Sequence, residues 1–313
     1  MPEERRGILY GVAAYALWGL FPLYWPLLQP AGSLEILAHR MAWSLVIVAG
    51  ILTVRRHWAW FGPMLREPRK LGLLVLAALL ITINWGTYIY AVNSGHVVEG
   101  ALGYFINPLV NVLFGVVLLR ERLRRTQWAA VGLGTLAVLV LTLDYGRLPW
   151  IALVLATTFG TYGLVKKTAK VGAAESLTIE SLVLAVPALG YLFLLHGQGV
   201  GTFGSFGWQH ALLLVSSGLV TVIPLLMFTA AAIRVPLSVV GLLQYIAPVL
   251  QFMCGVLIVK ETMPTSRWAG FAIVWLALAV FTWDALSHAR RNRIAAARSR
   301  DEAAVLQPER ATT

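Results

Sequence analysis

Long apolar stretches separated by short polar breaks run through most of this chain. A membrane-spanning helix needs about 20 predominantly apolar residues to cross a hydrocarbon core roughly 30 Å thick. Ten stretches approach this length, near residues 7–28, 35–54, 71–92, 98–119, 126–143, 148–165, 177–195, 209–230, 236–259 and 266–284. They are continuously apolar and lack the alternation of a porin strand. The pattern therefore predicts an all-α polytopic membrane protein with ten transmembrane helices.

An internal repeat relates the two halves of the chain. The matched residues lie 140 positions apart and are Pro108/Pro248, Gly115/Gly255, Arg120/Lys260, Glu121/Glu261, Trp128/Trp268 and Asp144/Asp284. Because each copy holds five spans, an odd number, the second copy enters the membrane from the opposite side. We therefore expect two inverted five-helix repeats, residues 1–146 and 147–285, followed by a basic, partly disordered cytoplasmic tail, residues 286–313. Inverted repeats are typical of secondary transporters.

Composition and charge agree with a membrane location. Hydrophobic residues make up 58% of the chain and charged residues 12%, whereas roughly a quarter of a soluble domain is charged. The net charge of +11 is distributed by loop and forms no patch, so no nucleic-acid partner is expected. With the N-terminus in the cytoplasm, the outer loops hold only Arg147, Lys260 and Arg267. This asymmetry follows the positive-inside rule and places both termini in the cytoplasm.

Polar residues recur on one face of the fourth and ninth stretches. Such residues are costly at membrane depth and usually face the bundle interior. Tyr104, Asn107 and Pro108 share a face of the fourth stretch, and Gln244 and Pro248 share one of the ninth. A mid-helix proline removes a backbone hydrogen bond and loosens the helix, so Pro108 and Pro248 are predicted hinges beside a binding site. The alternative is that these residues only pack helices together.

The third stretch adds further side chains that could line such a site. Asn84, Trp85 and Tyr88 lie along it, and Tyr245 directly follows Gln244 in the ninth stretch. Aromatic walls with a few polar anchors suit an amphipathic small solute. The alternative is again packing, which is the more frequent role of an aromatic residue in a membrane helix.

The ionisable residues at membrane depth are few: His39, Arg40, Glu99 and Glu180. Arg40 either reaches the outer headgroups or faces inward, and Glu99, in the same leaflet, is its expected counter-ion. Glu180 occupies the position equivalent to Arg40 in the second repeat. A carboxylate held in a low dielectric binds a proton readily, so Glu180 is the candidate for proton coupling. The alternative is a salt bridge to Lys166 or Lys167.

Signatures of nucleotide, metal and catalytic sites are missing from the sequence. It contains no GxxxxGK[ST] run, and its Gly132-Leu-Gly134 pair lacks the context of a dinucleotide site. The single cysteine, Cys254, and the six histidines show no metal-ligand spacing. We therefore expect no cofactor, no metal and no enzymatic activity. The only weak candidates for catalytic residues are His39 and Arg40 together with Glu99.

Six short segments carry a family resemblance: EILAHRMAWS (35–44), NW (84–85), AVN (91–93), LGYFINPL (102–109), FTAAA (228–232) and QYIAP (244–248). They closely resemble RarD-type proteins of the EamA family, in the drug/metabolite transporter superfamily. The resemblance implies a ten-helix permease of the bacterial inner membrane with a central cavity lined by the third, fourth, eighth and ninth spans. The implied substrate-binding residues are Asn84, Trp85, Tyr88, Tyr104, Asn107, Phe228, Gln244 and Tyr245.

These observations predict a secondary-active small-molecule transporter that exports amino acids, metabolites or amphipathic drugs. It would work by alternating access around a midplane cavity between the two repeats. Its partners would be a small-molecule substrate, the lipid bilayer and, as coupling ion, protons. The alternative from another class is a non-transporting membrane scaffold or assembly subunit, whose polar stripes would face lipid or a partner protein.

Overall fold

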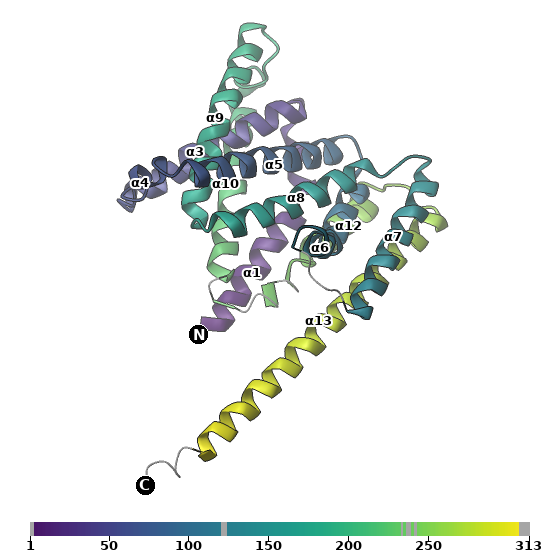
Figure 1. The fold of residues 1–313 in the computed structure, drawn as a ribbon. Helices are drawn as coiled ribbons and strands as arrows, with labels where there is room; N and C mark the ends of the chain where they lie inside the picture. Colours follow the sequence, from purple (N-terminus) through teal and green to yellow (C-terminus); the bar gives the residue numbers. More distant parts are fainter. Residues whose placement is uncertain (1–2, 120–123, 233, 236–238, 241–242, 307–313) are drawn as a thin grey trace.

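The described part of the first half of the chain folds into helices joined by turns and loops. The computed structural model describes residues 3–119, 124–232, 234, 235, 239, 240 and 243–306 (Figure 1). Arg120 and Glu121 of the sequence repeat lie outside these residues. The elements up to residue 146 are α1 Glu3–Gly19, α2 Phe21–Tyr24, the 3₁₀-helix η1 Trp25–Leu28, α3 Ser33–Val54, α4 Phe61–Leu65, α5 Pro68–Asn93, α6 Val97–Leu119 and α7 Arg125–Tyr145.

The second half is helical as well. Its described elements are α8 Trp150–Ala169, α9 Ala173–Gly197, α10 Gly207–Ala232, α12 Ile246–Met253, the π-helical turn η2 Cys254–Ile258 and α13 Thr265–Leu306. The part of the predicted tail up to Leu306 is thus helical and continues α13 beyond the body of the molecule (Figure 1). Among the described residues there is no strand.

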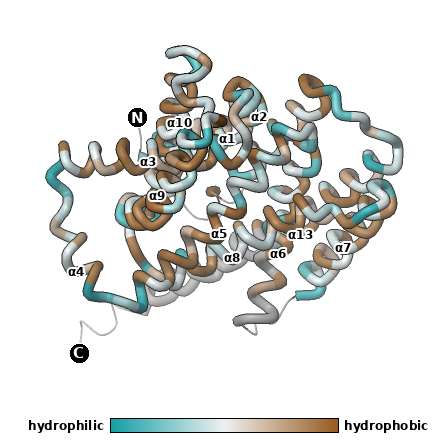
Figure 2. The backbone as a smooth tube through the Cα atoms, turned by 90° about the horizontal axis from the view of Figure 1, so that it is seen from above, coloured by the Kyte–Doolittle hydropathy of each residue, from teal (hydrophilic) through white to brown (hydrophobic). Residues whose placement is uncertain are grey.

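Several of these helices have the length and composition of membrane spans. Six qualify, namely α3, α5, α7, α9, α10 and the first part of α13, and the bent pair of α1 with residues 21–28 would be a seventh. The predicted fourth, sixth and ninth spans correspond to shorter apolar stretches, Val97–Val110, Trp150–Lys166 and Ile246–Ile258. Apolar positions run along the helices, and hydrophilic ones gather at turns such as those beside α4 (Figure 2). The described chain is therefore an all-helical membrane protein, and the count of ten spans stays a prediction.

Two prolines bend the first span. The axes of α1 and of the segment Phe21–Leu28 differ by 43°. Pro22 lies in the first turn of α2 and Pro26 in that of η1, where a proline fits because the first amides of a helix have no intrahelical acceptor. The same prolines cannot continue the hydrogen bonding of α1. The bend carries Phe21 and Trp25 into the main buried cluster, where η1 packs against α5 and α10.

Helices α7 and α13 pack side by side (Figure 1) and exchange equivalent polar contacts at their two ends. Thr126, at the start of α7, donates to Asp284, and Ser266, at the start of α13, donates to Asp144 at the end of α7. An arginine reinforces each end, Arg124 with Asp284 and Arg267 with Asp144. Thr126 and Asp144 precede Ser266 and Asp284 by 140 residues each. The pairing is therefore antiparallel and reciprocal between the two sequence copies.

A second reciprocal exchange involves the glutamates that begin α3 and α9. The Glu35 carboxylate accepts the backbone N–H and the hydroxyl of Thr202 at 2.7 and 3.0 Å, in the loop that follows α9. Glu175, 140 residues later, pairs with Nε2 of His57 at 3.2 Å, in the loop that follows α3. Each glutamate thus contacts the loop of the other sequence copy.

The two predicted hinge prolines occupy different helical positions. Pro108 lies inside the continuous helix α6. Pro248 lies in the first turn of α12, which begins at Ile246, so its missing N–H removes no intrahelical hydrogen bond. Residues 241 and 242 lie outside the described part of the chain, and the hinge role of both prolines stays a prediction. The described part of the ninth stretch is irregular at two places, the turn at Gln244 and Tyr245 before α12 and the π-helical turn after Met253.

Candidate functional site

Arg40 is buried at the centre of a group of aromatic rings. It projects from α3 and is only 2% exposed. Its guanidinium carbon lies 3.7 Å from the ring centroid of Trp85 on α5, 5.1 Å from that of Trp25 and 5.7 Å from that of Phe21. Its Nε–H donates to the hydroxyl of Thr221 on α10 at 2.7 Å. Of the two sequence interpretations of Arg40, the structure therefore shows the inward one.

The expected counter-ion of Arg40 has another partner. Glu99, at the start of α6, is 1% exposed and pairs with Arg147 at 2.8 Å. It also accepts the backbone N–H of Ile151, at the start of α8, at 3.0 Å. The predicted Arg40–Glu99 pair is therefore wrong, because the first turn of α6 packs against the segment that leads into α8. No carboxylate of the described residues forms an ion pair with Arg40.

Four predicted binding residues on α5 and α6 gather next to Arg40: Asn84, Trp85, Tyr88 and Tyr104. The Tyr104 hydroxyl donates to Oδ1 of Asn84 at 3.1 Å, and the rings of Tyr88 and Tyr104 meet edge to face with centroids 5.5 Å apart. The buried Tyr88 hydroxyl has no hydrogen-bond partner among the described residues. This cluster combines a cation, aromatic faces and an unpaired hydroxyl.

Both predicted asparagines tie helices together. Asn84 donates to the carbonyl of Leu155 at 2.9 Å and to the hydroxyl of Thr158 at 3.0 Å. Asn107 donates to the carbonyl of Ala156 at 3.0 Å. Their amide nitrogens thus bond to consecutive carbonyls of α8. These bonds fit the packing interpretation of the polar stripe, in which amides join neighbouring helices.

The predicted residues of the second half lie in other clusters. The Phe228 ring packs against Tyr15 and Trp18, with centroids 6.0 and 5.8 Å apart. Gln244 and Tyr245 are half-buried at the start of α12, and Tyr245 packs with residues of α6, α7 and α13. Trp18 touches both the Phe228 cluster and the cluster that holds Trp85. The eight predicted residues therefore do not form one continuous contact group in the described structure.

Glu180, the counterpart of Arg40, has its charge compensated. Its buried carboxylate pairs with Lys166 at 2.7 Å and accepts hydrogen bonds from Ser176 at 2.5 Å and Tyr162 at 3.2 Å. This is the salt bridge foreseen as the alternative to a coupling role, with Lys166 as the partner. The side chain of Lys167 lies outside the described residues. The two repeat-related positions thus differ, because Glu180 has an ionic partner among the described residues and Arg40 has none.

His39 faces away from the Arg40 cluster. It is buried and stacks on Phe203, in the loop after α9, with ring centroids 5.0 Å apart. Neither ring nitrogen has a hydrogen-bond partner among the described residues. Among the described residues no group of three or more metal-ligating side chains could hold a metal ion, so His39 belongs to no such group there.

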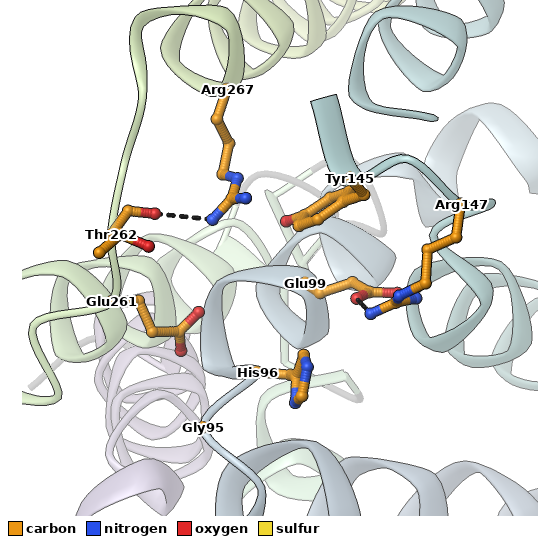
Figure 3. A pocket seen from close by; sticks show the side chains of 8 residues that line it. All are labelled: Gly95, His96, Glu99, Tyr145, Arg147, Glu261, Thr262 and Arg267. Atoms are coloured by element: carbon orange, nitrogen blue, oxygen red, sulfur yellow. Dashed lines mark hydrogen bonds and ion pairs between the residues drawn. The ribbon is translucent and has the colours of Figure 1, made fainter. Parts of the chain in front are cut away.

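A pocket of about 340 Å³ lies where the α5–α6 turn meets the end of α7 and the start of α13 (Figure 3). Figure 3 shows the Glu99–Arg147 pair and the contact of Arg267 with Thr262 on opposite sides of Tyr145. The amino-acid sequence does not show that a pocket forms here. Its signals are the charged residues Glu99, Arg147 and Arg267 and the repeat, which includes Glu261. Its lining residues are Gly95, His96, Glu99, Tyr145, Arg147, Glu261, Thr262 and Arg267.

Glu261 ties this pocket to the start of α6. Its carboxylate accepts the backbone N–H of Val98 at 3.1 and 3.2 Å, one distance for each oxygen. Burial raises the pKa of Glu261 to about 7, although the hydrogen bonds from Val98 and Val97 and the charge of Arg267 act in the opposite direction. A carboxylate that titrates near neutral pH and holds a helix end makes this contact sensitive to pH.

Known proteins identify the family of the chain. Residues 5–143 match the model of the EamA-like transporter family. Protein RarD of Streptomyces exfoliatus is 60% identical over 291 residues, which cover 93% of this chain and 92% of that protein. The chain is a RarD-type member of the EamA family. Protein RarD of Escherichia coli K12 is 41% identical over 290 residues, or 93% and 98% of the two chains.

Membership of the EamA family makes this protein a multi-pass membrane transporter. Its substrate is a small molecule, and membrane lipid surrounds it. The name of the matched family points to transport rather than to an enzyme. A solved crystal structure that is 20% identical in sequence has the same fold. It superposes with a TM-score of 0.57 over 88% of this chain and 97% of that one.

Proposed function

We propose that this EamA protein is a secondary-active transporter that exports small amphipathic molecules from bacterial cells by alternating access. The observation that carries the proposal is the exchange of equivalent contacts between the halves, Thr126 with Asp284 and Ser266 with Asp144. Two inverted copies that contact each other reciprocally can rock about a common axis and open toward either side of the membrane.

The proposed topology has ten spans, as two inverted five-helix repeats in residues 1–146 and 147–285, with both termini in the cytoplasm. The shorter apolar stretches in α6, α8 and α12–η2 supply the fourth, sixth and ninth spans. The excess of basic residues in the loops predicted to be cytoplasmic supports this orientation. The start of α1 and the far end of α13 point toward the same end of the molecule (Figure 1).

The proposed substrate site lies next to Arg40, between the two halves. Arg40 and Trp85 belong to the first half, and Thr221, which accepts the hydrogen bond from Arg40, belongs to the second. Tyr88 and Tyr104 extend the aromatic surface. In the proposed cycle, rocking of the halves brings Phe228, Gln244 and Tyr245 to this site, with Pro108 and Pro248 in the helices that bend.

Transport is tested in two steps. Metabolites retained and released by cells with and without the gene are compared, and the compound that differs most is then offered to the purified protein in liposomes. The proposal expects protein-dependent, saturable movement of that compound. Normal release by cells that lack the gene, together with inactive liposomes, would favour the scaffold alternative.

Proton coupling is proposed to occur at Glu180. Protonation of the Glu180 carboxylate, on α9, would break its ion pair with Lys166, on α8. Proton binding would thereby change the contact between these two helices. In vesicles with an imposed proton gradient, Glu180→Gln is expected to abolish gradient-driven accumulation and to retain exchange of substrate at equilibrium. Glu4→Gln, a change at an exposed residue of α1, is the control. Accumulation by Glu180→Gln at the wild-type level would contradict proton coupling at this residue.

A further inference from the structure

Arg40 is a buried cation without an anionic partner in the described residues. It is 2% exposed and appears in none of the ion pairs there. An arginine stays protonated in proteins, and the cost of moving such an ion out of water is several kcal/mol even after relaxation. Its pseudo-symmetric counterpart, Glu180, has Lys166. The missing negative charge at Arg40 is therefore a specific feature of this site.

The neutral neighbours of Arg40 satisfy it only in part. Thr221 accepts the Nε–H at 2.7 Å, whereas the two Nη groups donate to no described residue. Since a guanidinium has five N–H donors, four of them lack a described acceptor. The face of Trp85 at 3.7 Å contributes a cation–π attraction, which offsets only part of the cost of desolvation.

Two other buried donors beside Arg40 also lack acceptors among the described residues. They are the Tyr88 hydroxyl and the indole N–H of Trp25. The Trp25 ring is 5.1 Å from the guanidinium carbon, and Tyr88 lies close enough to Arg40 for an electrostatic interaction. The nearby hydroxyls of Tyr24 and Tyr104 do donate to protein oxygens. A buried donor without an acceptor destabilises the folded protein, so a ligand with acceptor oxygens is favoured here.

We infer that Arg40, Tyr88 and Trp25 bind the carboxylate of an organic monoanion, whose apolar part lies against Trp85. The inference rests on the proposed transport function and gives its substrate class. A guanidinium matches a carboxylate with two parallel N–H···O bonds. One positive charge balances one negative charge, and a phosphate dianion would exceed it. No described carboxylate pairs with Arg40 or is available beside it to hold an ammonium group, so an acid without an amine is preferred over an amino acid.

Matched pairs of probes test each element of this inference in purified protein in lipid nanodiscs. Benzoate is compared with benzamide, which has the same ring and shape and no charge. The compound 3-phenylpropionate is compared with phenylalanine, which adds only an ammonium group. Quenching of tryptophan fluorescence measures binding, because Trp25 and Trp85 contact Arg40. We expect benzoate to bind at least tenfold more tightly than benzamide, and 3-phenylpropionate more tightly than phenylalanine.

Three variants localise the binding. Arg40→Gln is expected to weaken benzoate binding tenfold or more and to leave benzamide binding unchanged. Tyr88→Phe removes only a hydroxyl that has no described partner, so it is expected to fold normally and to weaken benzoate binding about threefold to tenfold. Arg234→Gln, at a half-exposed arginine paired with Glu3, is the control and is expected to bind like the wild type.

Three results would overturn the inference. They are equal binding of benzoate and benzamide, no binding of either acid, and unchanged benzoate binding by both Arg40→Gln and Tyr88→Phe. These results are separable from a failure of the proposed function. A protein that transports neutral solutes in liposomes and ignores carboxylates would keep that function and lose this inference. If the protein binds benzoate through Arg40 and moves no solute, the binding site is supported and the proposed transport function is contradicted.

Discussion

At the scale of single residues, the chemistry of a side chain was easier to predict than its partner. Sequence alone marked Arg40, Glu99 and Glu180 as charges at membrane depth, and all three are buried. The Arg40–Glu99 pair was wrong because Arg147 reaches Glu99 from the segment before α8. Whether two charges meet depends on how helices pack, and sequence spacing within one helix does not contain that information.

The binding residues show the same limit. Asn84 and Tyr104 do contact each other, as expected for side chains that share one site. The amides of Asn84 and Asn107, however, bond to carbonyls of α8, a helix that the sequence analysis did not connect with them. Every residue carries the same backbone carbonyl, so the sequence of α8 does not indicate which of its carbonyls accept these hydrogen bonds.

Glu261 provides a residue-scale prediction about pH. Its carboxyl group titrates near its ordinary value in the unfolded chain and at about pH 7 in the folded protein. The folded protein therefore binds this proton more tightly, and its stability falls as pH rises from about 4.5 to about 7. Glu261→Gln keeps an acceptor for the Val98 N–H and removes the charge. It is expected to stabilise the protein by roughly 3 kcal/mol at pH 8 and to have little effect at pH 4.5.

The measurement is the thermal unfolding midpoint of the wild type and of Glu261→Gln in nanodiscs between pH 4.5 and pH 8. Glu67→Gln is the control, because Glu67 is an exposed residue that pairs only with Lys70 among the described residues. Identical pH dependence of the wild type and Glu261→Gln would show that Glu261 does not titrate in this range.

At the scale of elements, hydrophobic patterning located the helices well. Each of the ten predicted stretches overlaps a described helix, although the short helix α4 lies in a break of the pattern and α13 continues past the end of the last stretch. The pattern was less informative about helix ends and irregular turns. Pro248 indicated an irregular place in the ninth stretch, and the sequence did not show that α12 begins two residues before it. A proline restricts its own backbone, and the packing of the chain decides where the helix around it starts.

A close approach of two helices gives an element-scale prediction. A Cβ on Gly103 of α6 would lie 2.7 Å from Cβ of Leu155 and 2.9 Å from the carbonyl oxygen of Ala152, both on α8. Gly103→Ala is therefore expected to lower the free energy of unfolding by about 1–3 kcal/mol. Gly132→Ala on α7 meets nothing within 4 Å and is expected to be neutral or to stabilise by up to about 1 kcal/mol.

Denaturant unfolding of the two alanine variants against the wild type measures this difference. Equal stabilities of the Gly103 and Gly132 variants would mean that α6 and α8 are not in close contact in the membrane.

At the scale of the whole molecule, the 140-residue repeat was the most informative sequence feature. It marked Asp144 and Asp284 as equivalent, and the structure shows each bound to the start of the other copy's last helix. It also related Arg40 to Glu180, where the copies differ in charge and in partners. Matching residues in the sequence show which positions are equivalent. Only the packed structure shows which contacts these positions make.

The central claim is that the Arg40 site opens in turn to each side of the membrane. The direct test uses a Cys254→Ser background with one new cysteine, Tyr88→Cys, and a membrane-impermeant maleimide. The label is applied to right-side-out or to everted vesicles under conditions that favour each state. The account predicts labelling from both sides, with ions or substrate shifting the balance between them. Labelling from neither side, or from one side under all conditions, would contradict alternating access at this site.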